Sequence, residues 1–388
     1  MFFKNVSIVV FYTAIAQIIP LLILPILARI TSQDALGGYL YWHGIVSMLV
    51  VLAIARYDYA IFKEKNILNV YSIIKGIVIV ALFVSLLIFI IFYNVKNIYQ
   101  PWSMLEFYAF PVTLSIFCMA MILTLQAFLV YTSNFNILGV TKLLSSICIT
   151  LSILAAIYFQ PSEKYIIYGH TIGLTIALML TYIISRLRLT MVINSGLLRV
   201  IVIMRKHYRF PLFSLPADFI NMLAMYLPSF IISSKYGVEF VAIYAITIKV
   251  LSAPITLIAG AIMTVFKDVA SEQYRRLGHC RDVYLSTFKK MIIISMISLV
   301  IMFFTIEQIF ILIFGSEYSD SGKIALLMLP LFALKFVSSP LSYTLYLANW
   351  QRYDLLWQLC LLLLTFCSFF YSQTLFESIK LYVLGYSI

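Results

Sequence analysis

The sequence lacks charge. Only 11% of its 388 residues are charged, whereas about a quarter are charged in a typical soluble domain. Hydrophobic residues make up 63% of the chain and occur in long runs, with a mean hydropathy of +1.03. Runs of about 20 apolar residues without strict alternation are typical of transmembrane helices and not of barrel strands. The composition therefore predicts an all-α integral membrane protein that crosses the bilayer many times.

Catalytic motifs are also missing from the sequence. It contains no G-x-x-x-x-G-K-[ST] phosphate loop, and its four histidines do not cluster with one another or with its five cysteines. Every predicted connection is too short to form an enzymatic domain outside the membrane, the longest being about 25 residues. We therefore expect a protein that is not an enzyme and has no cofactor or metal site.

Eleven apolar runs predict membrane-spanning helices. They lie at 6–28, 39–61, 72–93, 105–130, 138–159, 165–185, 211–233, 240–265, 290–314, 324–348 and 354–372. The stub Ser378–Ile388 is too short to cross a bilayer, which requires about 20 residues. It is either an interfacial or re-entrant tail or, as we favour, a shortened twelfth helix.

Negative charge is scarce, with 15 acidic against 27 basic residues and a net charge of +12. Membrane topology explains this excess better than nucleic-acid binding does. If the N-terminus is cytoplasmic, 19 cations fall inside and 6 outside, and the remaining two, Lys249 and Lys335, lie within spans. By the positive-inside rule we predict a cytoplasmic N-terminus, with cytoplasmic loops at 186–209 and 267–289. The loops at 29–38 and 315–323 are then predicted to be periplasmic.

A weak internal repeat divides the chain into two halves. The segment "PILARITSQDALGGYLYW" and the later "PSFIISSKYGVEFVAIYAI" share the order and approximate spacing of proline, tyrosine and basic residues. Such halves are typical of transporters, with the substrate path between them. We predict two pseudo-symmetric bundles of about six helices around a central cavity. Their predicted boundaries are 1–188 for the first, 189–209 for a basic linker and 210–388 for the second, whose last helix is incomplete.

Polar residues inside the spans indicate where the substrate path runs. A lysine at mid-bilayer costs roughly 2.5–3.5 kcal/mol on insertion scales, and Lys249 and Lys335 are each followed by serine or threonine at helical spacing. The predicted residues of the substrate path are Lys249, Lys335, Lys142, Asp218, Asn221, Ser338 and Ser342.

Other roles remain open for several of these residues. Small polar faces also pack helices against one another, and Lys142 is close enough to a span end to extend to the membrane surface. Asp218 either neutralises a nearby lysine or binds a coupling proton or cation. Arg56 and Asp58 form an R-x-D pair that is more typical of a helix-end anchor.

The segment "FPLFSLPADFINMLAMYLPSF", residues 210–230, carries three prolines, an aspartate and an asparagine in an otherwise apolar run. Proline bends or breaks membrane helices, and polar residues accompany such breaks in transporters. We expect this segment to be the first, bent helix of the second bundle.

The same segment resembles the polysaccharide-biosynthesis membrane proteins of the Wzx type. The likeness extends over nearly the whole chain, through "LPILARITSQDALGGY", "RYDYAIF" and "IFGSEYSDSGKIALLMLPLFALKFVSSPLSYTLY". The resemblance implies a member of the multidrug/oligosaccharidyl-lipid/polysaccharide exporter superfamily. It further implies flipping of undecaprenyl-pyrophosphate-linked oligosaccharides, such as O-antigen units of lipopolysaccharide, across the bacterial inner membrane. A coupling proton or cation, a polysaccharide polymerase and a chain-length regulator are the partners that it implies.

Three functions compete with the flippase. A non-transporting assembly scaffold would need no buried charges. A multidrug or cation antiporter of the same superfamily should have an acidic path, which two mid-span lysines argue against. A membrane-integral polysaccharide polymerase should carry a large periplasmic loop, and the spacing of the spans leaves no room for one. We expect no nucleic-acid partner.

Overall fold

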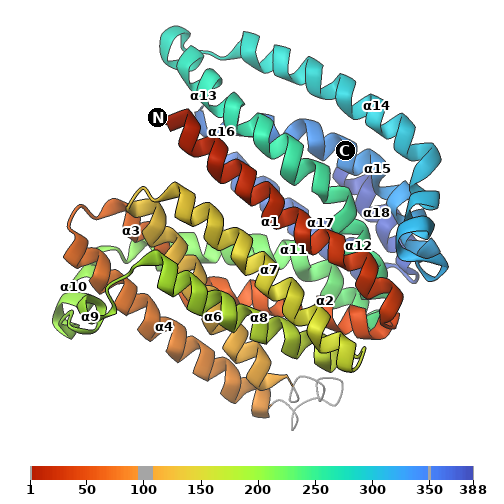
Figure 1. Cartoon of the computed structure of the whole chain (residues 1–388). Helices are drawn as coiled ribbons and strands as arrows, with labels where there is room; N and C mark the ends of the chain where they lie inside the picture. Colours follow the sequence, from red (N-terminus) through yellow and green to blue (C-terminus); the bar gives the residue numbers. More distant parts are fainter. Residues whose placement is uncertain (1, 95–107, 348–350, 388) are drawn as a thin grey trace. The chain divides into compact units, whose positions relative to one another are not determined.

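The computed structural model describes residues 2–94, 108–347 and 351–387 and is helical (Figure 1). Within these ranges, ten helices are long and apolar enough to cross a membrane, and no β-strand occurs. In hydrocarbon the backbone must satisfy its own hydrogen bonds, which favours helices. The prediction of an all-α, multi-pass membrane protein is confirmed.

The first half of the chain contains these helices: α1 Phe2–Ile30, α2 Gln33–Ile54, α3 Asp58–Lys63, α4 Ile67–Asn94, α6 Ala109–Tyr131, α7 Phe135–Phe159, α8 Glu163–Ser185, α9 Leu189–Ile193 and α10 Leu197–Lys206. The second half contains the π-helical turn η3 Phe210–Ser214, α11 Leu215–Lys235, α12 Val238–Pro254, the π-helical turn η4 Ile255–Ala259, α13 Gly260–Leu277, α14 Arg281–Phe314, the 3₁₀ turn η5 Ser316–Tyr318, α15 Ser319–Leu341, α16 Tyr343–Leu347, α17 Gln351–Tyr371 and α18 Leu375–Ser387.

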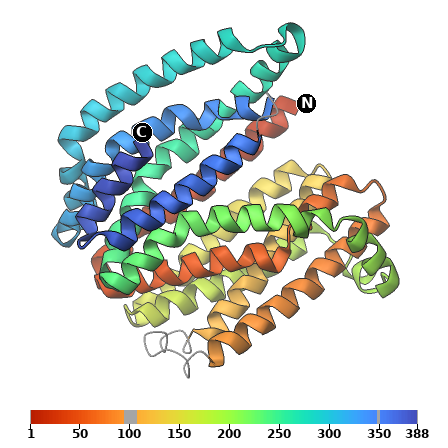
Figure 2. The same ribbon diagram turned by 180° about the vertical axis from the view of Figure 1, so that it is seen from behind.

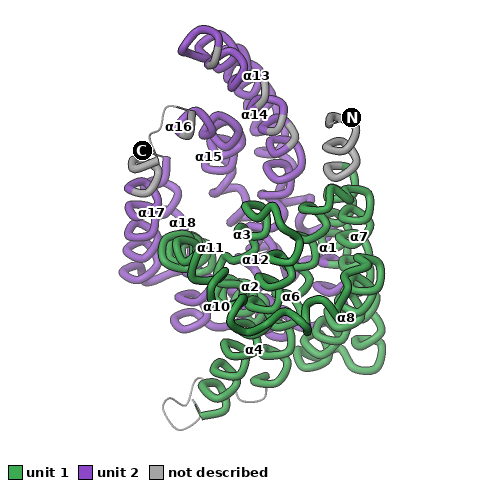
Figure 3. Tube along the Cα trace, turned by 90° about the vertical axis from the view of Figure 1, so that its left-hand side faces the viewer, with its two compact units in different colours: residues 1–23, 42–226 green, residues 24–41, 227–388 purple. Residues whose placement is uncertain are grey.

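The described chain forms two compact units, coloured separately in Figure 3. Unit 1 contains residues 1–23 and 42–226, and unit 2 contains residues 24–41 and 227–388. Three helices, α1, α2 and α11, therefore contribute to both units. The two units are defined by which residues contact one another in space. The boundaries predicted at 188 and 209 were based on the repeat in the sequence, so they stay a prediction.

Unit 1 is built around helices α4, α6, α7 and α8, which pack against one another as neighbours. Gly173 allows α8 to approach α7 closely, because a Cβ atom at this position would lie 2.5 Å from the Cα of Ile149. The buried hydroxyls of Ser115 and Thr171 are 3.0 Å apart and join α6 to α8. Small and hydroxyl residues thus mediate helix contacts, as is common in membranes.

Unit 2 is held together by α12, α14, α15 and α18. The buried Thr247 hydroxyl donates to the carbonyl of Ser321 at 3.1 Å, and the Ser321 hydroxyl donates to the carbonyl of Ile243 at 3.2 Å. These reciprocal bonds fix α12 beside α15. Gly37 brings α2 against α12, since a Cβ atom there would lie 2.0 Å from the carbonyl oxygen of Val238.

One predicted span boundary was wrong, and two predicted connections contain helices. The second span ends at Ile54 and not at 61, because Ala55 and Arg56 adopt left-handed backbone angles (φ 49° and 57°) that no glycine or proline announces. The linker 189–209 contains α9 and α10. The loop predicted at 267–289 is mostly helical, with a short turn at Gly278, whose φ is 71°.

The C-terminal stub is a helix, as we favoured. Helix α18 is 13 residues long, begins at Leu375 and packs against α15 and α17 (Figure 2). Its buried side chains include Leu375, Ile379 and Tyr382. The helix is thereby an integral part of unit 2.

Candidate functional site

The predicted substrate-path residues divide between the two units. Unit 1 contains Lys142, Asp218 and Asn221, and unit 2 contains Lys249, Lys335, Ser338 and Ser342.

Lys335 lies on α15 between two aromatic rings. Its Nζ atom is 4.3 Å from the ring centre of Tyr386 and 5.4 Å from that of Phe332. Such cation–π contacts contribute about 0.5–2 kcal/mol, more where water is excluded. Among the described residues, no carboxylate lies within ion-pair distance of Lys335. Tyr386 belongs to α18 and was not predicted from the sequence.

Lys249 lies on α12 and is half-buried. In the part of the chain that the structure describes, it too has no ion-pair partner. Its backbone carbonyl accepts a hydrogen bond from the Ser252 hydroxyl at 3.2 Å.

The two lysines lie at different depths in unit 2. The hydrogen bond between Thr247 on α12 and Ser321 on α15 places these two residues at the same height in unit 2. Residues that follow each of them in the sequence line the same cavity, so α12 and α15 run in the same direction. At about 1.5 Å per residue, Lys249 lies roughly 3 Å and Lys335 roughly 21 Å beyond that level. Their backbone positions are therefore separated by on the order of 15–20 Å along the helix axes.

Ser338 on α15 and Ser342, directly after its end, are exposed. The hydroxyl of Ser342 donates to the carbonyl of Ser339 in α15 at 2.8 Å. In η4 the exposed Thr256 donates in the same way to the carbonyl of Ala253. These hydroxyls form local hydrogen bonds, and their exposure leaves their remaining acceptor capacity accessible.

An apolar cavity of about 300 Å³ lies between α12, α14 and α15. Phe332 lines it and also contacts Lys335. Its other walls are aliphatic or aromatic, with Ser295 and Ser298 as the polar exceptions. The cavity is therefore suited to a hydrocarbon chain and not to a sugar.

In unit 1, Lys142 contacts a neighbouring helix. Its Nζ donates to the Thr13 hydroxyl on α1 at 3.2 Å. One turn further along α7, the buried Ser146 hydroxyl donates to the carbonyl of Ala16 at 2.7 Å. This face of α7 packs against α1, which favours the packing alternative for its serines.

Asp218 is paired with an arginine. The Nε atom of Arg56 lies 2.5 Å from the carboxylate oxygen of Asp218, although its N–H does not point along this line. The contact is an ion pair and not an aligned hydrogen bond. Arg56 also lies 3.9 Å from Asp58, whose pKa is raised by burial, against the lowering effect of Arg56. In this structure Asp218 is thus neutralised by an arginine and not by a lysine, and its alternative role as the site of a coupling proton or cation stays a prediction.

The proline-rich segment forms a π-helical turn, Phe210–Ser214, that continues into α11. Single π turns within helices are frequent at functional sites. Asn221 is exposed on α11, one turn after Asp218. The irregular helix start that the prolines predicted is thus present.

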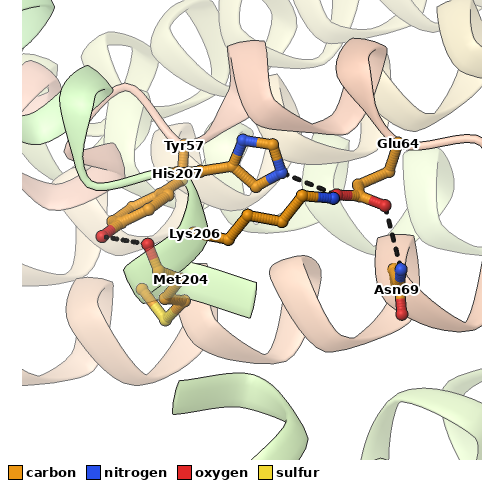
Figure 4. A network of polar contacts seen from close by, with 6 residues as sticks. All are labelled: Tyr57, Glu64, Asn69, Met204, Lys206 and His207. Carbon is orange, nitrogen blue, oxygen red and sulfur yellow. Dashed lines mark hydrogen bonds and ion pairs between the residues drawn. The ribbon is translucent and has the colours of Figure 1, made fainter. Parts of the chain in front are cut away.

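Unit 1 contains a buried charged cluster around Glu64 that the sequence analysis did not predict (Figure 4). Glu64, only 6% exposed, follows α3, and its Oε1 accepts hydrogen bonds from Lys206 Nζ at 2.5 Å and from His207 Nε2 at 2.7 Å. Asn69 donates to the other oxygen at 2.9 Å. Burial alone raises the pKa of Glu64, but these three donors outweigh it and lower the pKa to about 2.

This cluster fastens the linker to unit 1. Lys206 and His207 are 142 and 143 residues from Glu64 in the sequence, so no local pattern could have indicated it. The Tyr57 hydroxyl, 3.4 Å from the carbonyl of Met204, adds a contact nearby (Figure 4). The described residues contain no group of three or more histidine, cysteine or acidic side chains able to hold a metal ion.

Residues 26–323 of the chain match the model of a family described as polysaccharide biosynthesis protein. The match confirms the resemblance identified in the sequence. No curated protein sequence shows significant similarity to the chain.

Solved structures share the fold over nearly the whole chain. A multidrug resistance MATE-family transporter of the MOP superfamily, in an inward-facing conformation, is 14% identical, with 96% of this chain and 94% of that chain covered and a TM-score of 0.70. An outward-facing MATE transporter is 12% identical, with coverage of 99% and 92% and a TM-score of 0.64. A MOP-superfamily transporter from Pyrococcus furiosus, described as having a binding pocket of reverse polarity, is 13% identical, with coverage of 99% and 92% and a TM-score of 0.62. At these identities the likeness establishes the fold.

Proposed function

Because the chain belongs to the polysaccharide biosynthesis protein family and has the fold of a MOP-superfamily transporter, we propose that it is a flippase for lipid-linked sugars. Its substrate is an undecaprenyl-pyrophosphate-linked oligosaccharide repeat unit of O-antigen or a related surface polysaccharide. The protein moves this unit across the bacterial inner membrane by alternating access. Family and fold agree with the expectation that the chain is not an enzyme.

The observation that carries the proposal is the pair of lysines in unit 2. Lys249 and Lys335 lie within membrane-spanning helices and have no carboxylate partner among the described residues. A pyrophosphate is a strong acceptor for such cations, and the attraction grows where water is scarce. An organic cation would instead be repelled by them.

Their different depths suggest successive contacts. In this proposal the pyrophosphate meets one lysine and then the other as the headgroup crosses, while Ser338 and Ser342 offer hydroxyls to the glycan. The apolar cavity between α12, α14 and α15 accommodates part of the lipid chain. Each lysine then binds transiently, which favours release over trapping.

In unit 1 we propose supporting roles for the other three residues. Asp218, neutralised by Arg56, accepts a coupling proton or cation when the pair opens, and Asn221 is an additional polar contact one turn away. Lys142 attracts the anionic headgroup when α1 moves away from α7. The excess of basic residues at 186–209 and 267–289 supports a cytoplasmic N-terminus.

Complementation tests the proposal directly. The gene is expressed in a strain that lacks its own O-antigen flippase and makes a matching glycan, and surface polysaccharide is measured together with the amount of the protein in the membrane. The proposal predicts restored surface glycan and unchanged resistance to cationic drugs in an efflux-deficient strain. Drug resistance without surface glycan would instead identify a multidrug antiporter.

A further inference from the structure

The connection between the two sequence halves contains an amphipathic helix that is fixed to the side of unit 1. Helix α10 packs against α4, where the Met204 side chain lies against Gly76. A Cβ atom on Gly76 would lie 2.2 Å from the Met204 sulfur, so the glycine gives room to this side chain. Lys75 donates to the carbonyls of Ile193 and Ser195, both at 2.7 Å, and so fixes the turn between α9 and α10.

Three sectors divide the surface of α10. Val200 and Ile203 face the protein and are 3% and 8% exposed. A second sector is apolar yet uncovered, formed by Leu197, Leu198, Ile201 and Val202, each 60–81% exposed. The third contains the exposed cations Arg199 and Lys206. Residues at i, i+1, i+4 and i+5 share one helix face, so the apolar sector is continuous from Leu197 to Val202. The exposed Arg205, four residues after Ile201, ends this face.

The height of α10 along the unit places this apolar sector at the edge of the bilayer. Helix α4 has 28 residues, so it is about 42 Å long, while the hydrocarbon core is about 30 Å thick. Gly76, which α10 contacts, lies about 13 Å from the start of α4. Asn69 and Lys75 lie before Gly76, and the rest of α4 is almost entirely apolar up to Phe92, so the excess length of about 12 Å lies at the start of the helix. Helix α10 therefore lies where hydrocarbon gives way to headgroups, and its exposed leucine and isoleucine side chains reach lipid there.

Charge determines which lipid fits. Residues 186–209 contain six lysines and arginines and no aspartate or glutamate. The exposed apolar residues of α9, Leu189, Met191 and Ile193, extend the sector. An amphipathic helix with a basic flank binds anionic membrane surfaces through both buried apolar area and electrostatic attraction.

We propose that α9 and α10 form an interfacial anchor that inserts the apolar sector of α10 into the bilayer and binds anionic lipid headgroups through the arginines beside it. The anchor is independent of the transported substrate. Glu64 and Lys75 hold its protein face, and the lipid surface covers its opposite face.

Site-directed spin labelling of the full chain, reconstituted in vesicles, tests the anchor. The five native cysteines are replaced by serine, and single cysteines are introduced by Ile201→Cys and Arg199→Cys. The two positions are close on one helix and both exposed, so they form a matched pair. Collision rates with oxygen, which partitions into lipid, and with a water-soluble nickel chelate give the depth of each label. We expect the label at 201 to collide more often with oxygen, and the label at 199 to collide more often with the nickel chelate.

Lipid charge is tested in phosphatidylcholine vesicles with and without phosphatidylglycerol. Each basic residue near an anionic surface strengthens attachment by about fivefold. The lipid-facing population at 201 should therefore increase with phosphatidylglycerol and decrease at high salt. The double substitution Arg199→Gln, Arg205→Gln should remove this dependence; neither residue is ion-paired within the described chain.

Two results would overturn the proposal. Equal nickel accessibility at 201 and 199 in both kinds of vesicle would show that the apolar sector faces water. A lipid-facing label at 201 that responds neither to phosphatidylglycerol nor to the double substitution would exclude binding of anionic headgroups. Thermal unfolding of each labelled protein confirms that the fold is intact before either result is read.

Discussion

The two units differ in the partners of their most prominent buried charges. In unit 1 Glu64 binds Lys206 and His207, and Asp218 binds Arg56. In unit 2 the two lysines within the spans have no carboxylate partner among the described residues. One end-of-helix cation in unit 2, Arg29, is also used structurally, because its Nε donates at 3.0 Å to the carbonyl of Ile313 at the end of α14.

This difference separates structural charges from candidate functional ones. A buried charge without a partner costs free energy, and a paired one recovers part of that cost. The Glu64 cluster of unit 1 is explained by stability alone. Lys249 and Lys335 are not, since an apolar residue would stabilise the span more, and we infer that transport retains them.

The largest expected effect is the loss of transport on removal of both lysines. The double substitution Lys249→Ala, Lys335→Ala should reduce surface polysaccharide in the complementation assay by tenfold or more, about 1.4 kcal/mol or more in transition-state stabilisation. Replacement of both by arginine should retain much of the export, because the charge is kept. The alanine protein should still insert, as removal of a buried charge favours insertion. Normal glycan export at normal abundance from the alanine protein would refute the role of the lysines.

The next effect concerns the stability of unit 1. The pKa of Glu64 falls from an ordinary 4.5 to about 2 on folding, so its ionisation contributes up to about 3 kcal/mol. A lowered folded-state pKa stabilises the protein fully above pH 4.5, and this contribution is lost as the pH falls toward 2. Glu64→Gln should therefore lower Tm at pH 7 and flatten the acid-induced decrease in Tm.

A matched control lies in unit 2. Glu272 pairs with Arg276 at 2.6 Å, but both side chains are more than half exposed. Surface pairs of this kind contribute about 0.3–0.5 kcal/mol, so Glu272→Gln should leave Tm nearly unchanged. If the two glutamine variants had equal effects, burial would not distinguish the Glu64 cluster from a surface pair.

A smaller effect is expected at the second ion pair of unit 1. A double-mutant cycle with Arg56→Gln and Asp218→Asn should give a coupling energy of about 1 kcal/mol in unfolding measurements, since both side chains are partly exposed. Asp58→Asn is the control, because its oxygen lies 3.9 Å from the guanidinium. Its coupling with Arg56 should be weaker. A larger coupling at Asp58 than at Asp218 would reverse our assignment of the arginine's partner.

The smallest expected effect concerns the aromatic ring of Tyr386 beside Lys335 in unit 2. Tyr386→Ala removes the ring closest to Lys335 and should reduce export by about fivefold, corresponding to a cation–π contribution of about 1 kcal/mol. Tyr386→Phe keeps the ring and should retain export. Equal losses in both variants would assign the effect to the hydroxyl instead of the ring.

Much of the membrane architecture could be predicted from the sequence, because each span satisfies its own hydrogen bonds and is marked by its own apolar run. The same reasoning singled out Lys249 and Lys335 as anomalies. It could not predict the end of α2, where the left-handed Ala55 and Arg56 carry no glycine or proline signal. The helical character of the linker 189–209 was likewise hidden by its charge.

The sequence by itself determined that this is a multi-pass helical membrane protein of the polysaccharide biosynthesis family, with cations inside its second half. Only the tertiary structure decided which charges have partners. Glu64 finds Lys206 and His207, and Lys335 finds the ring of Tyr386, because packing brings together residues far apart in the chain. Apolar runs are local properties that a sequence records, whereas a partner for a charge depends on the distance between helices.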